Sequence, residues 1–321
     1  MKFRRLCVIL LFGTVLTVFL NLGTGYTALS LADFTGSTAN ATIAELRINR
    51  VLAMFLVGIS MPTSGFLLQE YFQNPLAGPS VLGISSVASL CVAFYMFLSS
   101  DFGWHELLQN GFISLSAIAG SLLMMLVLIG LTRRFHDKSF LIIFGFLVSA
   151  LAGAVVSVLQ LYADNQSLKN YVLWSFGAGS TVTRQQVVIL GGLVILGIGG
   201  AFQCIKPLIG HSLGVAYASS LGVDLQRLKL FIILSSSLLS AAVTAFLGPI
   251  LFIGIVVPHF SRMLYRPSQL WHQWILNLIL GVLVMEVFSV ASEHTHFPLN
   301  VITSLFGIPV ILAMLMKKRT L

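Results

Sequence analysis

The feature that most constrains this sequence is a series of long apolar runs separated by short polar or charged segments. A helix of roughly 20 apolar residues crosses the hydrocarbon core of a bilayer. Charged residues make up only 9% of the 321 residues and hydrophobic ones 57%, whereas a soluble domain has about 25% charged residues. The runs therefore predict an all-α integral membrane protein with about ten transmembrane helices. We place the spans at 6–27, 49–70, 80–99, 110–131, 139–161, 186–206, 229–248, 250–265, 273–293 and 299–316.

The basic residues orient these spans, because Lys and Arg are retained in cytoplasmic loops. Of the 18 Lys and Arg residues, fourteen fall on the side of the N-terminus. Both termini are therefore expected in the cytoplasm. The net charge of +8 has the same cause, so no nucleic-acid partner is predicted. The four basic residues on the opposite side are Arg47, Arg50, Lys169 and Arg184.

Three polar connections are too hydrophilic to span. The 28–46 and 162–185 segments should lie outside, and Tyr171 and Trp174 in the second suit a surface or re-entrant helix with its rings at headgroup level. The longest cytoplasmic connection begins at Pro207 and runs to about Arg227. Within it, Gly214 and Gly222 are expected to bracket a short helix.

Most catalytic signatures are missing from the sequence. It has no G-x-x-x-x-G-K-[ST] segment, so the chain is expected neither to hydrolyse a nucleotide nor to hold a cofactor itself. Glu286 is the one carboxylate well inside a predicted span, and we interpret it as hydrogen-bonded between helices. An ion-coupled secondary transporter, which needs such a group, is the alternative from another class. Glu293, His294 and His296 are interpreted as a solvated loop, with contact to a metal or chelate as the second interpretation.

Glycine and proline punctuation indicates a weak internal repeat in what we take to be one domain over 1–321. Gly78-Pro79 and Gly248-Pro249 are each followed by a second glycine, and the predicted topology puts the two pairs on opposite sides. Inverted repeats with broken helices are common in transporters. The first copy would cover about 46–161 and the second about 228–316, with a cytoplasmic loop at about 207–228.

Four segments spread over the chain resemble one family, the FecCD-type permeases of ATP-binding-cassette (ABC) importers. Residues 46–85 read LRINRVLAMFLVGISMPTSGFLLQEYFQNPLAGPSVLGIS and are similar to its L-R-x-P-R … N-P-L-A-x-P … L-G signature. Residues 218–223 (ASSLGV) match its cytoplasmic S-L-G segment. The segments GPILFIGIVVPHFSR (248–262) and FPLNVITSLFGIPVILAML (297–315) match two further motifs in the same order.

The resemblance implies the type II importer architecture, with ten helices per subunit in the bacterial cytoplasmic membrane. It implies a homo- or heterodimer of permease subunits, two partner ATPases that bind the ATP, and a periplasmic or lipid-anchored substrate-binding protein. The expected function is import of an iron chelate, a siderophore or haem. Cobalamin is the alternative cargo within the family.

The resemblance also implies roles for individual residues. Arg47 and Arg50 would receive acidic residues of the binding protein, whereas the position of a third family arginine is Ser289 here. Four residues would belong to the helix that couples the permease to the ATPase: Ser219, Ser220, Leu221 and Gly222. The candidates for helix breaks and the transport pathway are Gln69, Asn74, Pro75, Pro79, Gly248, Pro249, Pro258 and His259.

Overall fold

The computed structural model describes residues 3–35, 39–98, 106–135, 138–177, 182–265 and 269–317, and these residues form helices and connecting loops. The first half contains α1 (Phe3–Gly23), the 3-10 helix η1 (Leu31–Thr35), α2 (Ala41–Phe72), α3 (Ile84–Leu98), α4 (Glu106–Arg134), α5 (Lys138–Tyr162) and α6 (Asn165–Ser175). The second half contains α7 (Arg184–Ser212), α8 (Val215–Ser220), α9 (Leu225–Leu247), α10 (Ile253–Leu264), α11 (Leu270–Thr295) and α12 (Leu299–Lys317).

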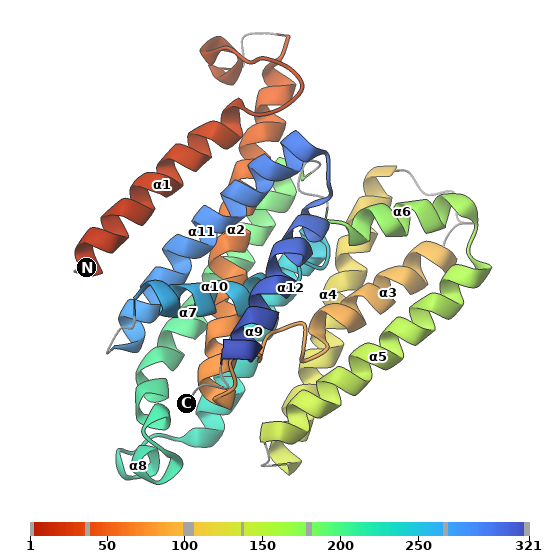
Figure 1. Ribbon diagram of the computed structural model, residues 1–321. Helices are drawn as coiled ribbons and strands as arrows, with labels where there is room; N and C mark the ends of the chain where they lie inside the picture. Colours follow the sequence, from red (N-terminus) through yellow and green to blue (C-terminus); the bar gives the residue numbers. More distant parts are fainter. Residues whose placement is uncertain are drawn as a thin grey trace.

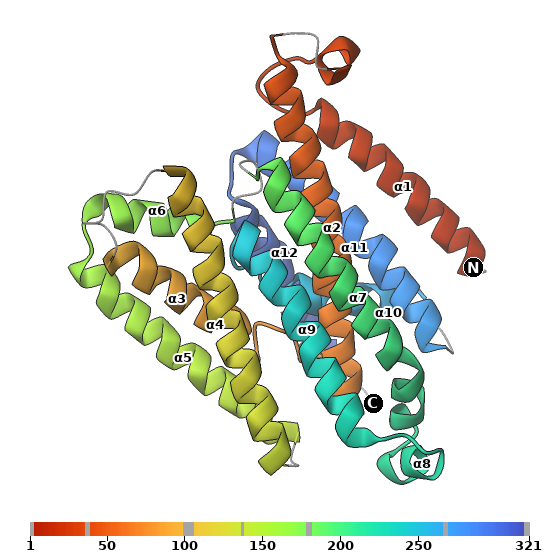
Figure 2. The ribbon, with the colours of Figure 1, turned by 180° about the vertical axis from the view of Figure 1, so that it is seen from behind.

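The helices form two groups. In Figure 1, α2 runs the height of the molecule among α1, α7, α9, α10 and α11, and α3, α4, α5 and α6 lie to one side. Figure 2 shows the same division from behind, with α9 between α4 and α7. The most apolar 18-residue windows of α2 and α9 are 78% buried, against 22% for α1 and α5. The centre of the fold is therefore α2 and α9, while α1 and α5 present most of their apolar surface outward, as lipid requires.

Each predicted apolar span corresponds to a helix in the described residues. Seven helices are long and apolar enough to cross a membrane, and three more, α3, α10 and α12, are apolar but shorter. The all-α membrane fold is thus confirmed. Two boundaries differ most from expectation. The helix of the second span starts at Ala41, and α7 continues through Pro207 to Ser212. Pro207 does not end α7 because a proline removes only one main-chain hydrogen bond, and a long helix tolerates that loss.

Glycines allow the central helices to cross at backbone contact. A Cβ atom on Gly65 of α2 would lie 1.7 Å from the carbonyl oxygen of Gly254 in α10, and a Cβ atom on Gly281 of α11 would lie 2.1 Å from the carbonyl oxygen of Gly58. Neither crossing leaves room for a side chain. Small residues at such crossings are the usual means of packing helices in a membrane, where burial of apolar surface drives little association.

The segments that connect the helices lie at two ends of the molecule, and side-chain hydrogen bonds join them at each end. At one end, the Lys229 Nζ donates to the carbonyl of Phe135 (3.1 Å), which joins the first turns of α9 to the α4–α5 connection. At the other, the Asn300 amide donates to the Ser175 carbonyl (3.1 Å), which joins α6 to the start of α12. Figure 1 shows α8 at the lower end and α6 toward the upper end. These are the two sides into which the charge pattern divides the loops.

The segment after α5 forms a helix, as expected. It forms α6, whose start is capped by Asp164, which accepts hydrogen bonds from the main-chain N–H groups of Gln166 and Ser167. Hydrogen bonds from Ser167 hold the pKa of this exposed carboxyl below its usual value. Tyr171 and Trp174 are both buried within the protein, because the Tyr171 ring packs on Trp174 and on Phe97 of α3. Their position at headgroup level stays a prediction.

Candidate coupling segment and outer rim

The residues matched to the coupling segment end a short helix by a glycine cap. Gly222 has a φ of 76°, and its N–H donates to the Ser219 carbonyl while the Val223 N–H donates to the Ala218 carbonyl, both at 3.0 Å. This pair of bonds is a Schellman motif, which needs a left-handed residue after the helix. The predicted short helix between Gly214 and Gly222 is therefore present as α8, and Gly222 fixes where it ends.

The coupling segment is anchored on one side and open on the other. Ala218 is fully buried, and Val223 packs over Gly210 of α7. Leu221 is 59% exposed and Tyr217 50% exposed, while Ser219, Ser220 and Gly222 are exposed as well. Exposed aromatic and aliphatic side chains on a rigid, anchored turn are suited to contact with another protein.

The first helix break follows α2, where both predicted amides bond to main-chain groups. The Gln69 Nε2 atom donates to the carbonyls of Gly254 (3.4 Å) and Ile255 (3.3 Å) in α10. The Asn74 Oδ1 atom accepts from the Leu76 N–H (2.9 Å) across Pro75. Two of the freed polar groups of the break are thus satisfied within the protein, as a non-helical segment at membrane depth requires.

The second break lies between α9 and α10 and meets the first. Gly248, with a φ of 77°, ends α9, and Pro249 follows it before the chain enters α10. At the start of α10, Pro79 lies beside Gly254. The two breaks are thus in contact, although the inverted repeat itself stays a prediction.

Two more pathway candidates lie within α10. The Pro258 carbonyl accepts a hydrogen bond from the Gln273 Nε2 atom of α11 (3.2 Å), and His259 is half-buried. The Gln273 bond ties α10 to α11 through the carbonyl of a residue inside the helix. Pro258 therefore has a packing role in this structure.

The two arginines matched to the docking site are not exposed. Arg47 and Arg50 are 5% and 6% exposed. Arg47 donates to the carbonyls of Leu22, Gly23 and Thr27. Both guanidinium groups are covered because the chain after α1 folds over them. Their part in docking stays a prediction.

Arg50 belongs to a buried polar network between α1, α2 and α11. Its Nη1 atom lies 2.5 Å from the Glu293 Oε1 atom, and its Nη2 atom donates to the Asn21 carbonyl (2.7 Å). The Asn21 amide in turn donates to the Glu286 Oε2 atom (2.6 Å), and Ser289 donates to the Asn21 Oδ1 atom (3.3 Å). Glu286 is hydrogen-bonded between helices, as the sequence predicted.

Sequence reasoning missed two members of this network. Asn21 and Ser289 are buried and join α1 to α11. A signal for Asn21 was present, since it is the only amide in the apolar run of α1, and an amide inside a span needs a partner. Ser289 stands where the family has an arginine, and in this chain it takes part in packing.

In the acidic and histidine cluster, Glu293 and His296 each contact another side chain of the protein. Among the described residues there is no group of three His, Cys, Asp or Glu side chains that could hold a metal. Glu293 is occupied by Arg50. His296 instead stacks on Tyr26, with ring centroids 5.1 Å apart and a bond of 2.9 Å between the Tyr26 hydroxyl and its Nδ1 atom. The solvated-loop interpretation fits the exposed His294 and His296.

Comparison with known proteins supports the family suggested by the motifs. The chain is 32% identical to the hemin transport system permease protein HmuU of Yersinia pestis over 96% of this chain and 95% of that protein. It is 31% identical to the vitamin B12 import system permease protein BtuC of Vibrio parahaemolyticus over 86% and 82% of the two chains. A solved metal-chelate type ABC transporter in an inward-facing conformation shares the fold, with a TM-score of 0.84 at 24% identity over 98% of this chain and 100% of that one.

The family assignment covers almost the entire sequence. The FecCD transport family model matches residues 6–317, which include all four motif segments. The helices that carry those motifs form a multi-pass membrane protein. The chain thus belongs to the FecCD transport family and is a transmembrane permease subunit of an ABC importer.

Proposed function

We propose that this permease subunit imports an iron chelate, haem or a ferric siderophore, across a bacterial cytoplasmic membrane. The observation that supports this cargo is the 32% identity to a hemin permease over nearly the full length of both chains. Relatives that import vitamin B12 are almost as similar, at 31% identity. Cobalamin is therefore the second candidate cargo, and haem and cobalamin are both bulky ring systems that carry a metal.

In this proposal the chain works with partners. A second permease subunit completes the pathway, two ATPase subunits bind and hydrolyse the ATP, and a substrate-binding protein delivers the cargo. Ser219, Ser220, Leu221 and Gly222 contact the ATPase. The support is geometric: these residues are exposed, and they stand on a capped helix that Ala218 anchors to α7. A rigid turn of this kind transmits a movement of the ATPase to α7 and α9.

The docking role of Arg47 and Arg50 takes a modified form. Since both side chains are buried, we propose that they shape the surface for the binding protein by holding the 22–27 segment against the outer ends of α2 and α11. The exposed Tyr26 and His296 would then lie on that surface. Contacts of this kind set orientation and encounter rate more than affinity.

The test is reconstitution of the chain with the ATPase subunit and binding protein that co-purify with it from native membranes. Proteoliposomes are supplied with haem, a ferric siderophore or cobalamin, with and without ATP inside. We expect ATP-dependent accumulation of haem or siderophore iron. Accumulation of cobalamin alone would establish the second candidate. Uptake without ATP that is lost in Glu286→Gln would instead indicate an ion-coupled transporter.

A further inference from the structure

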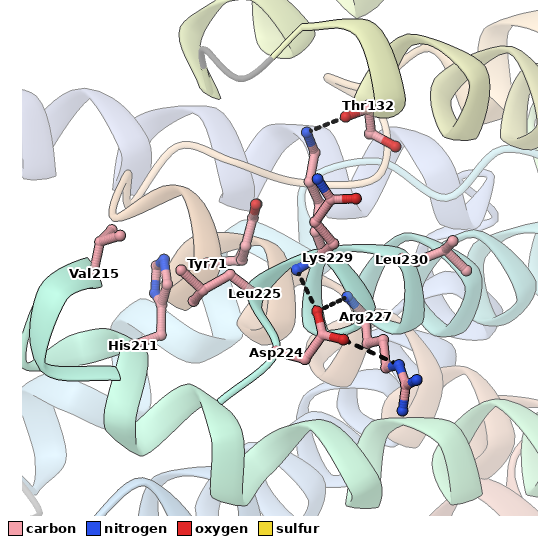
Figure 3. A pocket seen from close by; sticks show the side chains of 10 residues that line it. Tyr71, Thr132, His211, Val215, Asp224, Leu225, Arg227, Lys229 and Leu230 are labelled. Atoms are coloured by element: carbon pink, nitrogen blue, oxygen red, sulfur yellow. Dashed lines mark hydrogen bonds and ion pairs between the residues drawn. The ribbon is translucent and has the colours of Figure 1, made fainter. Parts of the chain in front are cut away.

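A cavity of about 530 Å³ opens at the end of the molecule that carries α8. Its walls come from α2, α4, α7, α8 and α9, so it lies between helices of both groups. Figure 3 shows Lys229 and Thr132 on one side of it and His211 and Val215 on the other. A volume in this range accommodates a small ligand or a lipid headgroup.

Lys229 supplies a positive charge to this cavity, whose lining also holds Asp224 and Arg227. Its Nζ atom donates to the main-chain carbonyls of Thr132 (2.8 Å) and Phe135 (3.1 Å), which are neutral acceptors. An ammonium group has three donors, so one remains. No carboxylate in the described part of the chain forms an ion pair with Lys229. The acid nearest in sequence, Asp224, is paired with Arg227 at 3.0 Å.

The opposite wall of the cavity is aromatic and apolar. The His211 ring stacks on the Tyr71 ring, with centroids 5.1 Å apart and planes 20° from parallel, and both residues are buried. Leu230 and Val215 add aliphatic surface to the lining. The lining therefore combines the Lys229 ammonium group and the Asp224–Arg227 pair with a surface suited to glycerol and acyl carbons.

Its position matches the boundary of a membrane. Lys229 lies one turn inside the start of α9, and Thr132 lies in the last turn of α4, and both helices are candidate spans. Basic pockets between transmembrane helices at the cytoplasmic boundary bind the headgroups of anionic lipids. A zwitterionic headgroup would place an additional positive charge beside Lys229.

We propose that this cavity binds the phosphate group of an anionic phospholipid, with Lys229 as the cation and the glycerol against the His211–Tyr71 stack. The lipid would fill the space between α8, α9 and the end of α4. It would thereby link the coupling segment to the group formed by α3, α4, α5 and α6. This proposal requires only that the chain spans a membrane, and it holds whichever cargo the importer carries.

The experiment measures lipid binding by the purified full chain without any transport assay. Delipidated protein in detergent is titrated with phosphatidylglycerol or phosphatidylcholine, and bound lipid is counted by native mass spectrometry alongside the melting temperature. We expect phosphatidylglycerol to bind and to raise the melting temperature more than phosphatidylcholine does. Lys229→Gln should weaken phosphatidylglycerol binding about fivefold, the effect of one cation near a membrane surface. Lys206→Gln, an exposed cation of α7 outside the cavity lining, should leave binding unchanged.

A second variant separates lipid binding from the structural role of Lys229. Val215→Trp fills the cavity from α8 without touching the bonds of Lys229 to α4, and it should also reduce phosphatidylglycerol binding. Equal binding by wild type, Lys229→Gln and Val215→Trp would overturn the site. If glycerol 3-phosphate raised the melting temperature of lipid-free protein as much as phosphatidylglycerol does, the ligand would be a soluble phosphate and the lipid assignment would be wrong.

Discussion

At the scale of single residues, the charges of this membrane protein are held largely by neutral groups. Arg47 donates to three main-chain carbonyls, Lys229 to two, and Glu286 accepts from the amide of Asn21. Arg50 has both a carboxylate and carbonyls as partners. Isolated buried charges are expensive, so each of these contacts stabilises a group that would otherwise favour water.

The ion pair of Arg50 gives the first prediction. Glu293→Gln keeps the shape of the side chain but leaves a buried guanidinium without its counter-charge, which costs about 3 kcal/mol in unfolding free energy. The measurement is denaturant unfolding of the purified chain in detergent. Glu45→Gln is the matched control, because Glu45 is an exposed carboxylate of α2, the helix that carries Arg50. Equal stability of Glu293→Gln and wild type would show that the pair contributes nothing.

The cap of α8 gives the second prediction. Gly222→Ala places a Cβ on a left-handed residue at a cost of about 1–2 kcal/mol, which should loosen the turn that carries Leu221. We expect ATP-driven uptake to fall several-fold while the melting temperature of the chain stays close to that of wild type. Gly222→Asn should recover most of the uptake, since asparagine also adopts this conformation. Uptake at the wild-type rate in Gly222→Ala would remove α8 from the coupling path.

At the scale of elements, the long helix α2 organises the fold by close crossings. Gly58 admits the backbone of α11 and Gly65 that of α10, seven residues further along the same helix. The Ser64 hydroxyl, between them in sequence, donates to the Ser236 carbonyl of α9 (2.9 Å). Small and hydroxyl residues of α2 thus specify its contacts with α9, α10 and α11. Apolar side chains alone would pack against lipid as well as against these helices.

The crossing at Gly65 gives the third prediction. Gly65→Ala forces α2 and α10 apart, and we expect a loss of about 1–3 kcal/mol in unfolding free energy, the usual cost of overpacking. Gly192→Ala in α7 is the control, because a Cβ there meets nothing within 4 Å and alanine favours helix. In thermal unfolding in detergent, the melting temperature should therefore fall for Gly65→Ala and rise slightly for Gly192→Ala, each relative to wild type. A stable Gly65→Ala would mean that the crossing adjusts at little cost.

The sequence was informative about elements and poor about their partners. Apolar length predicted the helices, and Gly214 and Gly222 predicted α8, because both signals are local. The burial of Arg47 and Arg50 depended on a loop more than 20 residues away and on Glu293, and nothing local to the arginines indicates either. The burial of Tyr171 was hidden for the same reason, since its neighbour Phe97 comes from α3.

At the scale of the whole molecule, the charge pattern and the fold agree on two ends, and this gives the fourth prediction. With the three natural cysteines replaced by alanine, Ser219→Cys should react with a membrane-impermeant thiol reagent only in inside-out vesicles. Thr295→Cys, exposed at the opposite end of the molecule, should react only in intact spheroplasts. The opposite labelling of both positions would invert the topology, and labelling of both from one side would refute the division into two ends.

The bond between Asn21 and Glu286 joins residues 265 positions apart in the chain, and this separation sets an order of events during synthesis. At about 5–20 residues per second, α1 leaves the ribosome about 13–53 s before the part of α11 that receives it. During that interval the helix is in the bilayer without its neighbour, and its single amide lacks the carboxylate that later pairs with it. Helix α1 is therefore made long before the neighbour that receives its amide, and its packing is complete only once α11 has been made.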